Sequence, residues 1–179
     1  MSWVLANLPT IAGHLLAHLL QAVPTIIASF VLAIPIARLA RVARPLRAVL
    51  VTGSSLLYAV PSLALFVILP IILATGIRDP LNVIVALTLY GLALLVPATA
   101  DALDAVDARV LDAATAMGMG RLRCFLTVEL PLAGPAILTG LRVVTVSTIS
   151  LTTVGAVLGV RSLGWLFTDG FQRGITAEI

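Results

Sequence analysis

The sequence predicts an all-α membrane protein, because its composition is strongly apolar and its uncharged stretches are long. Hydrophobic residues make up 60% of the 179 residues and charged residues only 11%, and the mean hydropathy is +1.15. A soluble domain is far less apolar than this. A helix needs roughly 20 apolar residues to cross the hydrocarbon core, and several stretches reach that length. We therefore treat residues 1–179 as a single transmembrane domain.

The amino-terminal region is predicted to contain an interfacial helix followed by the first crossing. No lysine, arginine, aspartate or glutamate precedes Arg38, whereas a cleaved signal peptide opens with basic residues. Residues 1–20 have helical periodicity with leucines on one side, which favours a helix lying along the interface, and residues 21–37 form the first crossing. His14 and His18 are spaced to share a metal, but no cysteine or acid lies near them, so the polar face of a helix is favoured over a metal site.

Three further crossings follow. Residues 48–77 are uncharged and would span about 45 Å as one helix, which exceeds one straight crossing. We expect Pro61 and Pro70 to break or tilt this helix. Residues 80–100 form the third crossing. Residues 132–160 form the fourth, interrupted only by Arg142, which we place near the inner interface with its side chain reaching out to water.

The arginines orient the chain. Seven of them lie in two regions, residues 38–47 and residues 101–131, and these regions are on the same side because two crossings separate them. Only three arginines fall on the opposite side. Positive residues are in excess in cytoplasmic loops, so residues 101–131 are predicted to be cytoplasmic and the amino terminus to begin outside. The net charge of +3 reflects this orientation, and nothing indicates a nucleic-acid partner.

Residues 101–131 form the most polar and most patterned segment of the chain. Asp107 is a predicted cap for a helix over residues 108–117, and Gly118 supplies its left-handed stop. A second short helix over residues 121–129 is predicted to end at Pro131. The small residues around the turn leave space for a partner to approach closely. Two interpretations stay open from these residues: a docking surface, or a loop packed on its own bundle.

Lysine is absent, since all eleven basic residues are arginines. A phosphate-binding loop of the G-x-x-x-x-G-K-[ST] kind is therefore excluded, and so is a Schiff-base lysine. Any ATP chemistry linked to this protein must reside in a partner.

The stretch D-A-A-T-A-M-G-M-G-R-L-R-C-F-L-T-V-E-L-P, residues 112–131, resembles the "EAA" loop in permease subunits of binding-protein-dependent ATP-binding-cassette (ABC) importers. The wording D-A-A-x-x-M-G-M, the Y-A-V-P of residues 58–61 and the Leu163-Gly164 pair are most similar to the osmoprotectant branch. Asp112 stands where the wider family has glutamate, so the charge is kept. The resemblance extends over residues 18–174, most of the chain.

The resemblance implies a MetI-like ABC permease bundle of about five crossings, of which the last is missing from this chain. It also implies that residues 101–131 are a cytoplasmic coupling loop, whose short helix seats in a separate ATP-hydrolysing subunit. ATP and Mg would then be bound by that partner, and this chain would hold no cofactor and would not itself be an enzyme. The implied coupling residues are Asp112, Ala113, Ala114, Met117, Gly118, Met119, Leu130 and Pro131.

The implied partners are two cytoplasmic ATP-binding subunits, a second permease and an extracytoplasmic binding protein that selects the solute, all at the bacterial plasma membrane. The second permease is either a copy or, slightly favoured, a related chain. The implied solutes are glycine betaine, choline, carnitine or proline. One alternative is an importer permease for methionine or a sulfonate. Another is half of an ion-coupled secondary transporter, which is disfavoured because Arg142 is the lone ionisable residue within the four charge-poor stretches apart from the two histidines.

Polar residues within the spans are candidates for the translocation pathway. Two hydroxyl stripes recur at helical spacing, and two tyrosines offer aromatic faces to a quaternary ammonium group. The alternative is that the hydroxyls bond the backbone or a neighbouring helix, and that the tyrosines simply pack. The candidates are Ser55, Tyr58, Ser62, Tyr90, Thr145, Thr148 and Thr152.

Overall fold

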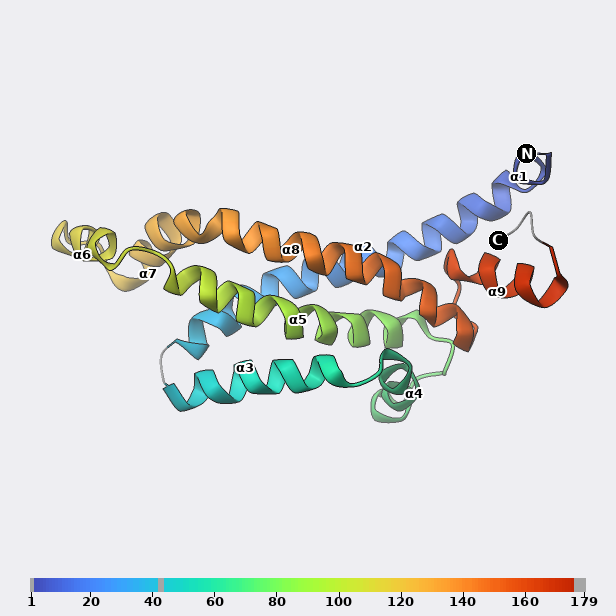
Figure 1. Cartoon of the computed structure of the whole chain (residues 1–179), viewed down its shortest axis with the longest axis horizontal. Coiled ribbons are helices and arrows are strands. Elements are labelled where there is room, and N and C mark those ends of the chain that lie inside the picture. The colour runs from blue at the N-terminus through green and yellow to red at the C-terminus, as the bar shows by residue number, and fades with distance from the viewer. Residues whose placement is uncertain (1, 42–43, 176–179) are drawn as a thin grey trace.

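The computed structural model describes residues 2–41 and 44–175, which form an elongated bundle of helices (Figure 1). Within these ranges, three helices are long and apolar enough to cross a membrane: α2 (Leu8–Ala40), α5 (Pro80–Asp104) and the continuous helix Arg121–Leu158. A bent pair of helices adds a fourth span if the pair counts as one. All the described secondary structure is helical, which confirms the predicted all-α membrane class.

The amino-terminal helix α2 follows the short helix α1 (Ser2–Ala6) and runs for 33 residues, about 50 Å at the usual rise. It has no break at Leu20, so the structure does not separate an interfacial helix from the first crossing. The polar residues around that point do not mark a boundary because His18 and Gln21 are both 2% exposed and pack into the bundle. That residues 1–20 lie along the lipid surface stays a prediction.

The second predicted crossing is broken, as expected, at Pro61. Helix α3 (Arg44–Ala59) ends just before this proline, and α4 (Ser62–Leu73) begins just after it. The two helices meet at an angle of 106°. Pro70 does not break the second helix, and a tilt there stays a prediction. It lies in the last turn of α4, where the helix loses a single backbone hydrogen bond before ending at Leu73.

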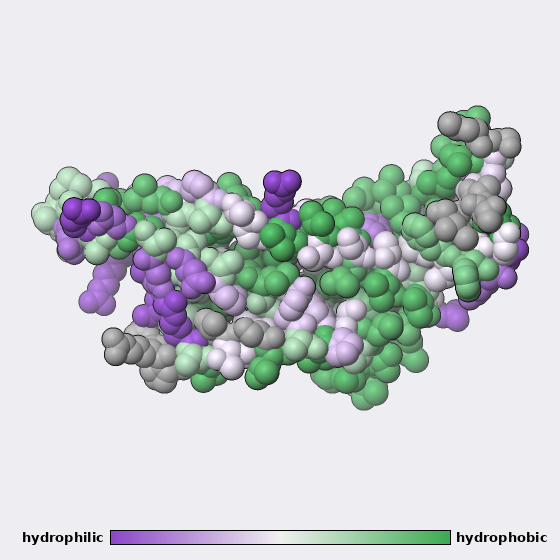
Figure 2. All heavy atoms as spheres, in the orientation of Figure 1, coloured by the Kyte–Doolittle hydropathy of each residue, from purple (hydrophilic) through white to green (hydrophobic). Residues whose placement is uncertain are grey.

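Helix α5 is the central element of the bundle. It contacts α2, α3, α4 and the carboxy-terminal long helix α8 (Leu130–Thr152), and Val83, Leu87, Leu95 and Leu103 on it are almost fully buried. Figure 2 shows apolar residues over the middle of the molecule and hydrophilic residues gathered towards its two ends. This distribution is the one expected of a protein that spans a bilayer.

The fourth crossing belongs to a helix that is longer than predicted. Helix α7 (Arg121–Cys124) continues through a π-helical turn, η1 (Phe125–Glu129), directly into α8. Pro131 therefore does not end the second short helix, and this prediction was wrong. The π turn explains why: the N–H of Leu130 donates to the carbonyl of Phe125, five residues back, so the widened turn accommodates a proline that has no N–H of its own.

Arg142 lies in the middle of α8, 13 residues after Glu129, a distance of about 20 Å along a helix. Its place at the inner membrane interface stays a prediction. Beyond α8, a 3-10 turn η2 (Thr153–Leu158) leads to the short helix α9 (Gly164–Arg173). Helix α9 and α1 lie at one end of the bundle, and α6 (Ala108–Ala116) with α7 lies at the other (Figure 1).

Candidate functional site

The short helix predicted within residues 101–131, the predicted coupling loop, is present as α6, with the predicted caps. Asp107 precedes it, and its Oδ1 accepts the backbone N–H of Arg109 at 2.9 Å. The side chain of Arg109 also donates to Asp107, with 2.8 Å between Nη2 and Oδ2, and these hydrogen bonds lower the pKa of the Asp107 carboxyl. Gly118 ends the helix in the left-handed region, at a φ of +83°. Both caps are encoded by residues adjacent to the helix.

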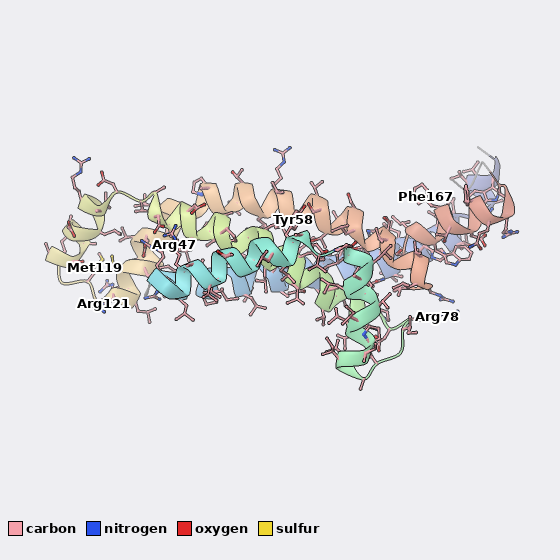
Figure 3. All side chains as sticks on the ribbon, turned by 60° about the horizontal axis from the view of Figure 1, so that its bottom comes forward. Arg47, Tyr58, Arg78, Met119, Arg121 and Phe167 are labelled. Carbon is pink, nitrogen blue, oxygen red and sulfur yellow. The ribbon has the colours of Figure 1, made fainter. Side chains whose placement is uncertain are left out.

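One face of α6 points away from the bundle. Asp112, Ala113 and Gly118 are exposed, and Met117 is 72% exposed. Figure 3 shows Met119, half-buried in the turn that follows, at the same end of the molecule as Arg121. The exposed face of α6 is free for a partner in the single chain.

Three other predicted coupling residues do not belong to the exposed face of α6. Ala114 is 2% exposed, because the inner face of α6 packs on α7 and η1. Leu130 is half-buried against the core cluster that includes Phe125 and Ile137, and Pro131 belongs to the first turn of α8. Their predicted role in contacting a partner stays a prediction.

A cluster of charges at the base of the coupling loop was not predicted. Arg41 lies 2.7 Å from Asp104, measured from Nε to Oδ1, and also pairs with Glu129. Arg47 pairs with Asp104 and lies 3.3 Å from Asp101. The sequence does contain a signal for this cluster, because these arginines and acids are predicted to lie on one side of the membrane.

Two of the predicted pathway residues form an aromatic pair in the middle of the bundle. The rings of Tyr58 and Tyr90 are 5.8 Å apart and meet edge to face at 70°. They line a cavity of about 10 Å³ together with Ser147 and Thr148, enough for about one water molecule. Tyr90 is 6% exposed, and its hydroxyl has no hydrogen-bond partner among the described residues. The structure thus brings together Tyr58, Tyr90 and Thr148 from three helices.

The remaining pathway candidates are placed differently. The hydroxyl of Thr145 donates to the carbonyl of Leu141 at 2.8 Å, and that of Thr152 donates to the carbonyl of Thr148 at 2.7 Å. Both hydroxyls are therefore bonded within their own helix, as in the alternative interpretation. Ser62 is half-buried at the start of α4. The side chain of Ser55 lies outside those that the structure describes.

The opposite end of the bundle holds contacts that sequence reasoning also missed. The ring of His14 stacks on Trp165, with centroids 4.7 Å apart and planes 8° from parallel. The Nε2 of Gln21 donates to the carbonyl of Arg161 at 2.7 Å. In the described residues no three metal-ligating side chains gather in one place. His14 thus contacts an aromatic ring at this end.

Two comparisons of sequence place the chain among transport permeases. The glycine betaine/carnitine/choline transport system permease protein OpuCD of Bacillus subtilis (strain 168) is 28% identical over 153 residues, which cover 86% of this chain and 66% of that protein. The ergothioneine transport permease/ergothioneine binding protein EgtU of Helicobacter pylori (strain G27) is 36% identical over 126 residues, which cover 70% of this chain and 22% of that protein. This chain therefore spans only part of either relative.

The fold has a close counterpart among solved structures. An inward-facing MetNI methionine ABC transporter aligns with a TM-score of 0.78 at 20% identity, over 92% of this chain and 80% of the other. This confirms the MetI-like helical bundle. The family model for the binding-protein-dependent transport system inner membrane component matches residues 26–179. Since that match covers most of the sequence, the chain belongs to the binding-protein-dependent transport system inner membrane component family.

Proposed function

We propose that this chain is the permease subunit of an ATP-driven importer for compatible solutes and forms half of its translocation pathway. Its family places it in the bacterial plasma membrane as a multi-pass component. The observation that supports the proposal most directly is α6, a capped helix with an exposed outer face at the polar end of an apolar bundle. A helix of this kind is not required to span a membrane, and it suits a docking role.

The outer face of α6 would seat in a groove on a cytoplasmic ATP-binding subunit. The chain cannot supply a P-loop lysine because it contains no lysine, so ATP and Mg would be bound by two such subunits, and the ATPase activity would be theirs. Asp112, Ala113, Met117 and Gly118 are exposed residues of this face. ATP binding would move α6, and the helices joined to it would then alternate between inward- and outward-facing arrangements.

The Tyr58–Tyr90 pair supports a pathway for a quaternary ammonium solute. An aromatic face attracts such a cation, and Tyr90 contributes a buried hydroxyl that lacks a partner among the described residues. Tyr58 is 48% exposed in the single chain, so one wall of the site is open and a second permease, a copy or a related chain, would complete it. The cavity of about 10 Å³ is too small for a solute, and the two rings must separate for passage.

Solutes are proposed by similarity to the named relatives, among them glycine betaine, carnitine, choline and ergothioneine permeases. Glycine betaine, choline, carnitine and proline are the first to test, and an extracytoplasmic binding protein would choose among them. A permease for another small solute, such as methionine, is the second candidate.

The test is solute uptake by proteoliposomes that contain the complete complex, with ATP enclosed on the side of the ATPase subunits. We expect ATP-dependent uptake of a labelled quaternary ammonium solute that persists when ionophores collapse all ion gradients. Uptake driven by an ion gradient without ATP would overturn the ATP-driven mechanism in favour of a secondary transporter. ATP-driven uptake of methionine or a sulfonate, without any of the four solutes, would overturn the solute assignment alone.

A further inference from the structure

We propose that α2 is a rigid link that carries the movement of the coupling loop to α9 at the opposite end of the protein, with Arg41 as its inner attachment. This inference rests on the proposed function, because it concerns how ATP-driven motion of α6 spreads through the chain. It assigns positioning roles to Arg41, at the inner end of α2, and to His14, near its outer end.

At the inner end, Arg41 holds both ends of the coupling loop at once. Its guanidinium group pairs with Asp104, which precedes α6, and with Glu129, which follows α7. The two side chains of the Arg41–Glu129 pair are only 26% and 12% exposed, so neither is a freely solvated surface group. Breaking such a pair leaves a partly desolvated charge without its partner, which is costly. Moving the coupling loop away from Arg41 therefore breaks these ion pairs and is energetically unfavourable.

A second contact reinforces the first. The guanidinium group of Arg38, one turn earlier in α2, lies over the ring of Phe125 at 4.1 Å from its centre, a favourable cation–π geometry. Phe125 is 5% exposed and begins the π-helical turn that ends at Glu129. Both arginines thus contact the π-helical turn between α7 and α8. Turns of this type are frequent at functional sites.

Helix α2 is suited to transmit such a movement. It is a single helix of 33 residues, about 50 Å long, and Pro24 and Pro35 lie within it without ending it. Small buried residues, including Ala33 and Ala37, let it pack closely against its neighbours. A displacement at residue 41 is therefore passed on to the outer half of the same helix.

At the outer end, α2 holds the segment around α9. His14 stacks on Trp165 in the first turn of α9. Two turns further along α2, the Gln21 amide donates to the carbonyl of Arg161 at 2.7 Å and to its own helix at Ala17. Residues 161–165 are thus fixed to α2 by a stacked ring and by a partly buried hydrogen bond. The side chain of Gln21 is almost fully buried, whereas Arg161 is exposed.

Besides the packing of α5 on its neighbours, two routes join the coupling loop to α9. One is the chain itself, through α8 and η2. The other is α2, which is attached at each end by side chains alone. Because the two routes depend on different contacts, replacing Arg41 or His14 weakens the second and leaves the first intact, while Arg38 and Gln21 keep one contact at each end of α2.

The test measures uptake and ATP hydrolysis by the reconstituted complete complex, with the Arg41→Gln and His14→Leu variants and their combination. We expect each single variant to transport about tenfold less solute per ATP hydrolysed than the wild type. The rate of ATP hydrolysis should stay within about twofold of the wild-type rate. The double variant should be no worse than either single one, because two breaks in one link are not additive. Arg47→Gln is the matched control: Arg47 contacts Asp101 and Asp104 but has no ion pair with Glu129 among the described residues, and we expect near-normal coupling.

Normal coupling in Arg41→Gln would overturn the link, and so would losses that multiply in the double variant or an equal fall in uptake and hydrolysis. Should Arg41→Gln fail to assemble, Glu129→Gln carries the same expectation, because it removes the other half of the bridge. The proposed function is judged separately on the wild-type complex. Wild-type ATP-driven uptake with unaffected variants rejects the link alone, whereas the absence of wild-type ATP-driven uptake rejects both.

Discussion

Gly91 of α5 lies directly against Ser29 of α2. A Cβ atom at position 91 would stand 2.7 Å from the Cβ of Ser29 and nearer still to its Oγ, closer than atoms can approach. Ser29 is fully buried, and its hydroxyl donates to the carbonyl of Thr25 at 2.8 Å. The two long helices therefore meet backbone to backbone at this level, as small residues allow in membrane bundles.

Replacing Gly91 with alanine should separate α2 from α5 and lower the thermal stability of the detergent-solubilised protein by several degrees. Gly134→Ala is the control, because Gly134 is also helical but nothing lies within 4 Å of its Cβ position, so alanine there should be neutral or slightly stabilising. Adding Ser29→Gly to Gly91→Ala removes both opposing atoms and should recover part of the loss. Equal melting temperatures for the two alanine variants would contradict the close contact.

Gly118→Asp should uncouple transport from ATP hydrolysis without preventing membrane insertion. Gly118 has a φ of +83° with open space around it, so the substitution strains the backbone by about 1 kcal/mol and adds a charge beside the outer face of α6. Gly120→Asp is the matched control, since Gly120 has equal space and an ordinary φ of −66°. Substrate-stimulated ATPase and uptake at wild-type levels in Gly118→Asp would count against docking through α6.

Tyr90→Phe should raise the apparent KM for uptake without reducing thermal stability. The hydroxyl it removes is buried and has no partner among the described residues, a state that costs a protein about 1–3 kcal/mol. Thr152→Val should show the reverse pattern, because the Thr152 hydroxyl is bonded to the Thr148 carbonyl and does not line the cavity. A loss of stability in Tyr90→Phe with an unchanged KM would remove Tyr90 from the pathway.

The amino-terminal cap of α6 should resist acid down to about pH 4. The hydrogen bonds from Arg109 lower the pKa of Asp107 in the folded protein, so its stabilisation is fully present above the ordinary aspartate pKa and is lost as the pH falls through the lowered value. The asparagine of an Asp107→Asn variant caps a helix without titrating. Hydrogen exchange of the α6 amides should therefore match this variant from pH 8 to about pH 5. Hydrogen exchange in the wild-type protein should become faster than in the Asp107→Asn variant only in stronger acid. A difference between the two proteins near neutral pH would refute the lowered pKa of Asp107.

Helix α6 could be predicted from sequence because its signals are local. Asp107 and Gly118 flank the helix they delimit, and each acts on backbone groups within three residues of itself. Pro131 misled the same reasoning. Its effect on the helix depends on how the preceding turn is wound, and the π turn at Phe125–Glu129 leaves no pattern in the residue types.

By itself, the sequence determined the membrane class and the position of the short helix α6, since these depend on composition and on neighbours along the chain. The orientation predicted from the arginines stays a prediction. Only the tertiary structure decided that Tyr58, Tyr90 and Thr148 share a cavity and that Arg41 reaches Glu129, 88 residues away. Helical periodicity shows that a residue lies on a polar or apolar face. Which residues of other helices it contacts depends on how helices that are distant in the chain pack together. That packing is set by shape and volume across the whole bundle.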